Sequence, residues 1–235
     1  MDWRDAPDRV VVSPSEVHIW RISLAEYPQA FSELWQRLSP DERERANRYH
    51  FDRDRRRFII ARSALRFILS RYLDIPPERL QFQYAERGKP FLNDTALTFN
   101  LSHSHELALY VVALDRAVGI DIEYRRDVDY AALAQRFFSP REAATLNEIS
   151  LERKQSVFFD YWTCKEAYLK ATGEGIVGLQ NIEVEFPENA LPKLCGNFDR
   201  SWTLDRLEPH PDYTAALVVE GEIEARVLYN NLNLN

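Results

Sequence analysis

The feature that most constrains this chain is an internal repeat at an offset of 100 residues. HIWRISL (18–24) falls on VGIDIEY (118–124), and SPDE (39–42) falls on SPRE (139–142), without a gap. Single residues recur at the same offset, namely Arg53, Phe58 and Leu69, which match Arg153, Phe158 and Leu169. The repeat predicts two copies of one unit: a strand, a helix, an SPxE turn, a long helix and further strands.

The end of each copy carries a hairpin signal. ELALYVVAL, Asp-Arg and AVGIDIEY follow one another over 106–124, and TAALVVEG is followed by EIEARVLY over 214–229. We therefore predict an α+β pseudo-dimer of two similar lobes, each a long helix packed on a small antiparallel sheet. The N-terminal lobe is expected at 1–116 and the C-terminal lobe at 117–235, with the active site between them. One such chain is expected to act as a monomer.

Composition narrows the setting of the protein. The chain has 235 residues, of which 45% are hydrophobic, so it can bury a core. No apolar run approaches the roughly 20 residues that span a bilayer, and the first residues lack the order of a signal peptide. Cys164 and Cys195 are too few and too far apart for a disulfide framework. We expect a soluble cytoplasmic protein without a membrane partner.

Charge is distributed unevenly. Residues 1–118 carry a net charge of plus 1 and the remainder minus 8, which gives the total of minus 7. Arginine is concentrated between Arg45 and Arg71, and this segment is either a solvated helix face or a cationic binding patch. The acidic total argues against a general or specific nucleic-acid binder. If the partner is acidic, we expect it to dock on arginines of the first lobe or on an apolar patch between the lobes.

A carboxylate stands in the middle of the second long helix. The segment from about Arg153 to Thr172 has apolar residues on all sides, which is typical of a buried helix. Glu166 lies among them, with Lys165 beside it and Lys170 one turn later. A buried carboxylate needs a partner, because an unpaired one costs several kcal/mol. A salt bridge to Lys170 is the simplest candidate.

Two further carboxylates share one face of a strand. In VGIDIEY, Asp121 and Glu123 point to one side because side chains alternate along a strand. Either this face meets water, or a hard cation such as Mg²⁺ relieves the repulsion. The 100-residue offset aligns the three acidic positions with other residue types in the first copy, namely Arg21, Ser23 and Arg66. We therefore expect one metal site, in the second copy only.

A polar cluster occurs before the middle of the chain. TFNLSHSHELALY places Asn100, Ser102 and His103 beside a strand, and GKP at 88–90 adds a cation in a preceding turn. A zinc site is not indicated, because no cysteine or third histidine is near, and His105 is interpreted as structural. GEGIVG (173–178) resembles a dinucleotide-binding loop, but it ends a helix rather than opening one. It is interpreted as a helix stop.

Together these motifs resemble a known family. VGIDIE, FFSPRE and YWTCKEAYLK, preceded by GKP and FNLSHS, are similar to the surfactin-synthetase-type 4'-phosphopantetheinyl transferases, in the subgroup with tryptophan and KEA in the last motif. The resemblance implies a pseudo-dimer that transfers the phosphopantetheine arm of coenzyme A to a serine of an apo acyl, polyketide or peptidyl carrier protein. Adenosine 3',5'-bisphosphate is then released. Mg²⁺ is the implied cofactor, with Mn²⁺ as a substitute.

The resemblance also assigns residues to the metal and the diphosphate. The implied metal ligands are Asp121, Glu123 and Glu166, and Lys165 and Lys170 are implied contacts to the diphosphate. Mg²⁺ and lysines would spread the negative charge that develops there. The base that takes the serine proton is left open. Glu166 is the first candidate.

The remaining assignments concern the nucleotide and a water molecule. Residues that match the part of the family holding the 3'-phosphate and adenine are Arg53, Arg57, Ser102 and His103, with Gly88 and Lys89 in the turn beside it. Arg53 is displaced from a lysine of the family's pattern. Glu142 of SPRE matches a glutamate that orients a water near the metal, and that water is the second candidate base.

Two other functions use the same residues. A metal-dependent nucleotide phosphodiesterase could use the three carboxylates without any carrier protein. A non-catalytic RNA- or nucleotide-binding module could use the arginines, would tolerate loss of Asp121, and would bind with a steep salt dependence.

Overall fold

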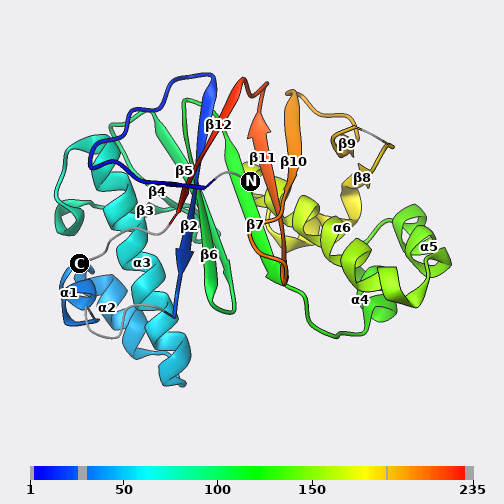
Figure 1. Cartoon of the computed structure of the whole chain (residues 1–235), viewed down its shortest axis with the longest axis horizontal. Coiled ribbons are helices and arrows are strands. Elements are labelled where there is room, and N and C mark those ends of the chain that lie inside the picture. The colour runs from blue at the N-terminus through cyan, green and yellow to red at the C-terminus, as the bar shows by residue number, and fades with distance from the viewer. Residues whose placement is uncertain (1–2, 26–30, 189, 231–235) are drawn as a thin grey trace.

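The computed structural model describes residues 3–25, 31–188 and 190–230 (Figure 1). The elements of the first half are β1 (Arg4–Asp5), β2 (Glu16–Ser23), α1 (Phe31–Gln36), α2 (Pro40–Asn47), α3 (Asp52–Leu73), β3 (Gln83–Tyr84), β4 (Pro90–Phe91), β5 (Leu97–Ser104) and β6 (Leu107–Leu114). Those of the second half are β7 (Val118–Tyr124), α4 (Tyr130–Phe137), α5 (Pro140–Glu148), α6 (Leu151–Thr172), β8 (Glu183–Glu185), β9 (Lys193–Cys195), β10 (Trp202–Leu207), β11 (Tyr213–Glu220) and β12 (Ala225–Asn230). Within the described ranges, no helix is both long and apolar enough to cross a membrane.

Two principal sheets carry the predicted α+β architecture. A five-stranded sheet has the order β1-β12-β2-β6-β5, and a three-stranded sheet has the order β10-β11-β7. We call the first sheet with α1–α3 the first lobe, and the second sheet with α4–α6 the second lobe. The strand orders β2-β6-β5 and β7-β11-β10 have the same topology: in each, the last of the three strands along the chain lies between the other two. The prediction of two similar halves, each with a long helix on antiparallel strands, is confirmed.

The lobes are stacked in four layers, helix, sheet, sheet, helix (Figure 1). One apolar cluster lies between the sheets and includes Ile19, Val111, Ile120 and Leu217. The opposite face of the first sheet packs with α3, and the opposite face of the second sheet packs with α6. Each sheet is therefore covered on both faces, and each long helix is held against its own sheet.

The two predicted hairpins are wrong. β6 pairs with β2 and β5, whereas β7 pairs with β11 in the other sheet. Likewise β12 leaves β11 and pairs in parallel with β2. Each short connection crosses between the sheets instead of closing a hairpin. The chain therefore returns to the first lobe's sheet at its end, although the predicted C-terminal lobe ran to residue 235.

The register of the repeat also differs from the predicted offset. Ile19 and Ile120 share the cluster between the sheets, whereas Trp20 packs with the α3 cluster. By strand face, Trp20 therefore corresponds to Asp121, at an offset of 101. Because side chains alternate, a slip of one residue moves every side chain to the other face. Arg21 is thus not the counterpart of Asp121.

Candidate active site

The edge strands of the two sheets meet where β5 lies beside β7. The Asn100 side-chain oxygen accepts a hydrogen bond from the Ile120 amide at 3.0 Å, and the Ser102 hydroxyl donates to Asp121 Oδ1 at 2.8 Å. These side chains take the place of ladder hydrogen bonds between two edge strands. The polar motif of β5 thereby fixes the position of the acidic motif of β7. Sequence analysis had assigned Ser102 to the nucleotide and left Asn100 without a role.

Gly119 allows α6 to lie directly against β7. A Cβ at this position would be 2.0 Å from the Ala167 carbonyl oxygen and 2.5 Å from the Ala171 amide nitrogen. Any side chain there would push the helix away from the strand. The close approach brings Asp121, two residues further along the strand, to the part of α6 that carries Glu166. Sequence analysis missed this role, because nothing in VGIDIEY shows what the glycine faces.

Asp121 is buried and Glu166 is half-buried, and both have incomplete hydrogen bonding. Asp121 is 4% exposed, and its Oδ1 accepts from Lys170 Nζ at 2.6 Å as well as from Ser102. Asp121 Oδ2 and Glu166 Oε1 are buried and have no hydrogen-bond partner within the described part of the chain. Lys170 therefore pairs with Asp121, and the simplest candidate partner of Glu166 is engaged elsewhere.

The pKa values of the two glutamates beside Asp121 are both raised. Burial, and then the Asp121 carboxylate, raises the pKa of Glu166 to about 7 against the opposing effect of Lys170. Burial and Asp121 also raise the pKa of Glu123, although Ser104 donates to Glu123 Oε2 at 2.9 Å. Lys170, together with Arg126 at 3.9 Å from Glu123 Oε2, leaves the three ionised carboxylates one positive charge short. The group has an unmet preference for positive charge.

This donor set fits a hard cation. Buried carboxylate oxygens without hydrogen bonds are suitable ligands for Mg²⁺, which is commonly held by one or two carboxylates together with substrate phosphates. Over residues 3–25, 31–188 and 190–230, no group of three or more His, Cys, Asp or Glu side chains is arranged so that it could hold a metal ion by itself. Any ion here would therefore need ligands from the substrate as well.

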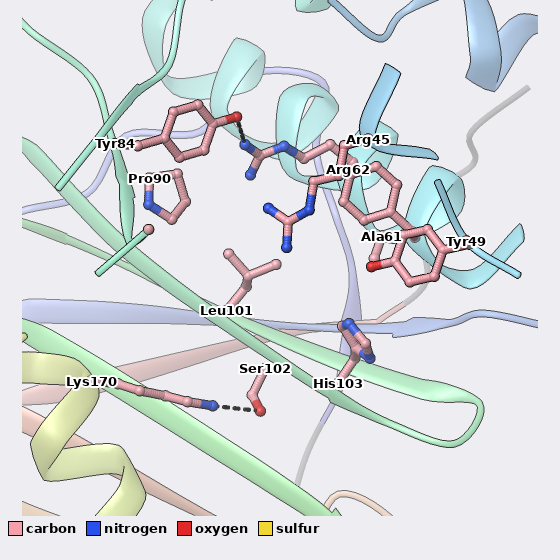
Figure 2. Close-up of a pocket in the computed structure, with 12 residues that line it drawn as sticks. Arg45, Tyr49, Ala61, Arg62, Tyr84, Pro90, Leu101, Ser102, His103 and Lys170 are labelled. Carbon is pink, nitrogen blue, oxygen red and sulfur yellow. Dashed lines mark hydrogen bonds between the residues drawn. The ribbon is translucent and has the colours of Figure 1, made fainter. Parts of the chain in front are cut away.

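A cavity of about 300 Å³ opens beside the carboxylates, between α2, α3 and β5 (Figure 2). Ser102, His103 and Lys170 of the predicted site line it. Lys170 Nζ donates to the Ser102 hydroxyl at 2.8 Å, and Figure 2 marks this hydrogen bond. Arg45 and Arg62 line the opposite wall. The cavity is basic and suits an anionic ligand. Sequence analysis noted the arginine-rich segment but did not single out Arg45 or Arg62.

The predicted arginines lie outside the lining of this cavity. Arg53 is 72% exposed, with its Nε 3.4 Å from Asp54. Arg57 is 17% exposed and lies 3.8 Å from Glu106 and 3.9 Å from Asp54. Arg57 still acts on the cavity through its charge. Burial, then Lys170, then Arg57 lower the pKa of His103.

A second cavity of about 260 Å³ lies on the other side of the GKP turn. Glu166, Lys170 and Gly88 line it, and Gly88 and Lys170 line the first cavity too. Gly88 has a φ of 80°, which favours glycine, so the turn can pass between the cavities. Lys170 therefore stands where the basic cavity, the second cavity and the carboxylates meet.

Lys165 and Glu142 lie in a different place from the predicted one. Lys165 is fully buried and its Nζ donates to Glu142 Oε2, while Glu142 also accepts from the Ser139 amide at 2.9 Å and the Val184 amide at 2.9 Å. Lys165 Nζ also lies 5.0 Å from the centre of the Phe138 ring. The side chain thus points toward α5, because adjacent residues of a helix face different directions. This geometry does not support the predicted diphosphate contact, nor a Glu142-bound water near the carboxylates.

Comparisons with known proteins agree on one family. A model described as "4'-phosphopantetheinyl transferase, N-terminal" matches residues 20–115, and one described as "4'-phosphopantetheinyl transferase superfamily" matches residues 117–218. The 4'-phosphopantetheinyl transferase HetI of Nostoc sp. is 45% identical over 224 residues, which cover 93% of this chain and 94% of that protein. The 4'-phosphopantetheinyl transferase Sfp of Bacillus subtilis is 27% identical over 75% of this chain and 84% of its own. A crystal structure of a holo-(acyl-carrier-protein) synthase from Bacillus anthracis aligns with a TM-score of 0.40 and 21% identity, over 45% of this chain and 96% of that one.

Proposed function

Because this chain belongs to the 4'-phosphopantetheinyl transferase superfamily, we propose that its carboxylates and basic cavity transfer the phosphopantetheine arm of coenzyme A to a carrier-protein serine. The serine oxygen forms a bond to the phosphorus next to pantetheine. The bond from that phosphorus to the bridging oxygen of the diphosphate breaks. Adenosine 3',5'-bisphosphate leaves with the electron pair. The serine proton must be taken up by a base of the enzyme or by solvent.

The carboxylates are proposed to hold Mg²⁺, with Asp121 and Glu166 as the principal ligands and Glu123 beside them. The observation that supports this assignment is the pair of buried oxygens, Asp121 Oδ2 and Glu166 Oε1, that have no hydrogen bond among the described residues. When bound, the ion would neutralise charge on the diphosphate oxygens and fix their orientation. Mn²⁺ has the same preference for oxygen ligands and would substitute.

Lys170 is proposed to contact the diphosphate directly. Its ammonium stands between the two cavities and is 28% exposed on the side chain, so a ligand can reach it. In this structure it bonds to Asp121 and Ser102. A phosphate oxygen could replace either contact. The positive charge would then stabilise the leaving bisphosphate, where negative charge develops.

Glu166 is the proposed acceptor of the serine proton. The pKa of about 7 belongs to the metal-free protein, and a bound Mg²⁺ would lower it, so this assignment depends on the position of the carboxylate and not on its pKa. Glu166 is close enough to Asp121 for their charges to interact, and its second carboxylate oxygen would accept the proton while Oε1 holds the ion. Glu142 is occupied by Lys165 and two backbone amides, so the alternative route through a Glu142-bound water has no support from this geometry.

The basic cavity is proposed to hold the 3'-phosphate and adenine of coenzyme A. Arg45 and His103 line it and are the nearest candidates for the 3'-phosphate, while Arg57 raises the local positive potential from just outside. A charge-assisted hydrogen bond contributes about 1.5 to 3 kcal/mol, or roughly 10-fold to 150-fold in affinity. Arg45→Ala should therefore weaken binding of coenzyme A by that factor but hardly change binding of 3'-dephospho-coenzyme A. Calorimetry of both ligands with both proteins measures the coupling between Arg45 and the 3'-phosphate. Equal losses of affinity for the two ligands would show that Arg45 does not contact the 3'-phosphate.

The carrier protein is proposed to dock mainly on the first lobe. Carrier proteins are acidic as a class, and residues 119–235 carry a net charge of minus 8. Raising the salt concentration should then increase the KM for the carrier more than that for coenzyme A, because exposed charge pairs are screened beyond roughly 8 Å at physiological ionic strength. A carrier KM that does not respond to salt would indicate an apolar docking patch between the lobes.

The decisive experiment is a transfer assay read by mass spectrometry. The protein is incubated with coenzyme A, Mg²⁺ and a panel of apo carrier proteins, and each carrier is weighed. One phosphopantetheine arm should be added to at least one carrier, but not to its serine-to-alanine variant. Asp121→Asn is the matched enzyme control and should be inactive. Release of bisphosphate without a carrier would instead indicate a phosphodiesterase. Ligand binding without any product would indicate a binding module.

A further inference from the structure

Lys89 has a position that the proposed chemistry does not use. It ends the turn between β3 and β4, where the Ala85 amide donates to the Lys89 carbonyl at 2.9 Å and the Gly88 amide donates to the Ala85 carbonyl at 2.8 Å. This closed turn belongs to the first lobe. Its lysine nevertheless reaches into the second lobe, and burial lowers the pKa of its ammonium to about 8.

The Lys89 ammonium binds three carbonyl oxygens of the second lobe. Nζ lies 2.5 Å from the Lys170 oxygen, 3.3 Å from the Ala171 oxygen and 3.3 Å from the Val118 oxygen. The first two belong to the last turn of α6 and the third to the start of β7. Carbonyls in the last turn of a helix have no partner within the helix, and a cation there also interacts favourably with the helix dipole. The Gly173 amide bonds only to the Leu169 oxygen at 2.8 Å.

We propose that Lys89 is a positioning residue that fixes the end of α6, and with it the side chain of Lys170, relative to the first lobe. Lys170 is held at both ends: its carbonyl oxygen accepts from Lys89, and its ammonium bonds to Asp121 and Ser102. Ser102 belongs to the first lobe and Asp121 to the second. Lys89 thus joins the lobes on the backbone side of the same residue whose side chain joins them in the site.

This placement differs from a direct contact with coenzyme A. For its ammonium to reach a phosphate, Lys89 would have to give up three carbonyl contacts, two of them in the last turn of α6. A positioning role predicts that loss of Lys89 lowers kcat, because a displacement of about 1 Å can cost up to roughly 100-fold in rate. A direct role predicts mainly a weaker affinity for coenzyme A. The inference rests on the proposed function only for this kinetic readout.

The first test is hydrogen exchange in Lys89→Met, with Lys193→Met as the control. Lys193 is an exposed lysine on β9, so its loss reports only the removal of a surface charge. Amide exchange in the last turn of α6, through residue 173, should rise by about 10-fold or more in Lys89→Met and stay unchanged in the control. Unchanged exchange in Lys89→Met would overturn the proposal, whatever reaction the protein catalyses. If Lys89→Met fails to fold, Lys89→Gln keeps one donor and is measured in its place.

The second test couples Lys89 to Lys170. We expect kcat to fall by about 10-fold to 100-fold in Lys89→Met, with the coenzyme A Kd changed by less than about 3-fold. In a Lys170→Met background, Lys89→Met should cost less than about 3-fold more, because its effect acts through Lys170. Equal losses in both backgrounds would overturn the positioning role. If exchange rises but transfer in the wild type is absent, the failure lies with the proposed function and not with Lys89.

Discussion

The two lobes fill the space between strand and helix in opposite ways. In the first lobe, Trp20 and Ile22 point from β2 toward α3 and are fully buried. The second lobe has Asp121 and Glu123 at the matching strand positions, and Glu166 projects among them from α6. One lobe uses the interface for its apolar core. The second lobe also has an apolar core between α6 and its sheet, but three carboxylates interrupt it at these positions.

The buried glutamates of the SPxE turns sharpen this contrast. Glu42 accepts from Arg62 Nε at 2.5 Å, from Arg66 Nε at 2.7 Å and from the Ser39 amide at 3.0 Å. Glu142 is equally well satisfied, by Lys165 and two amides. These carboxylates have all their partners within the fold, whereas Asp121 and Glu166 do not. Asp160 and Asp205 also have an unbonded oxygen, but each is a single acid paired with an arginine, whereas the candidate site brings three carboxylates together.

The largest expected effect comes from removing one of the unsatisfied acids. Asp121→Asn should lower transfer by about 1,000-fold or more, which corresponds to about 4 kcal/mol, because a ligand of the proposed ion is lost. Trp20→Phe at the matching position of the first lobe should cost stability but leave kcat within about 3-fold. Turnover of both variants and their unfolding in urea give the comparison. Near-normal turnover of Asp121→Asn at low Mg²⁺ would refute the proposed metal site in the second lobe.

The buried ion pairs should behave alike in the two lobes. Lys165→Met and Arg66→Met each leave a buried glutamate with fewer partners, so each should lower the free energy of unfolding by about 3 kcal/mol. Neither should change the Kd of coenzyme A by more than about 3-fold. Denaturation and calorimetry measure both quantities. If Lys165→Met lost much of its affinity for coenzyme A but kept normal stability, the diphosphate contact predicted from the motif would be supported instead.

The closeness of helix and strand also differs between the lobes. The strand position that holds Gly119 in the second lobe holds His18 in the first, by the same face-matched offset of 101. Gly119→Ala should destabilise the protein by about 1 to 3 kcal/mol, because the new methyl group would overlap the Ala167 carbonyl. It should also lower transfer by moving α6. His18→Ala is the control, because the alanine there meets no such overlap. If transfer survived Gly119→Ala, α6 would not need to lie so close to β7.

A further prediction is a pH dependence of opposite sign in the two lobes. The pKa of Glu166 is about 7 when folded and 4.5 ordinarily, so the metal-free protein should lose stability as pH rises from 4.5 to 7. Burial lowers the pKa of His18 from 6.5 to about 4, so its contribution is lost as pH falls from 6.5 to 4. Each slope is at most about 1.4 kcal/mol per pH unit. Glu166→Gln should remove the first trend and His18→Gln the second, and a variant that leaves its trend intact would refute that assignment.

Local patterns predicted the elements, but contacts between elements decided the details. Helical periodicity predicted a helix over about 153–172, and α6 spans Leu151–Thr172. Strand alternation placed Asp121 and Glu123 on one face. The hairpins failed because a short connection between two strong strands does not reveal whether it turns within a sheet or crosses to another.

The site residues divide in the same way. Helix geometry already turns Lys165 away from Glu166 and puts Lys170 on the same face, but the partner of Lys165, Glu142 of α5, could not be predicted from the sequence. Arg45 could not be separated from its neighbouring arginines, because the wall of the basic cavity is formed by α2, α3 and β5 together. The offset of 100 is wrong by one residue in the strands, where the correct offset is 101. A shift of one residue moves each side chain to the other face of the sheet.

Ion binding tests the contrast between the lobes most directly, without reference to turnover. Mn²⁺ is titrated into the protein with coenzyme A present, and free Mn²⁺ is followed by electron paramagnetic resonance. We predict one ion per chain in the wild type, an affinity at least about 10-fold weaker in Asp121→Asn and in Glu166→Gln, and no change in Glu188→Gln, which removes an exposed carboxylate. Equal affinity in the wild type and in both site variants would contradict the account, because the unsatisfied carboxylates would then hold no ion.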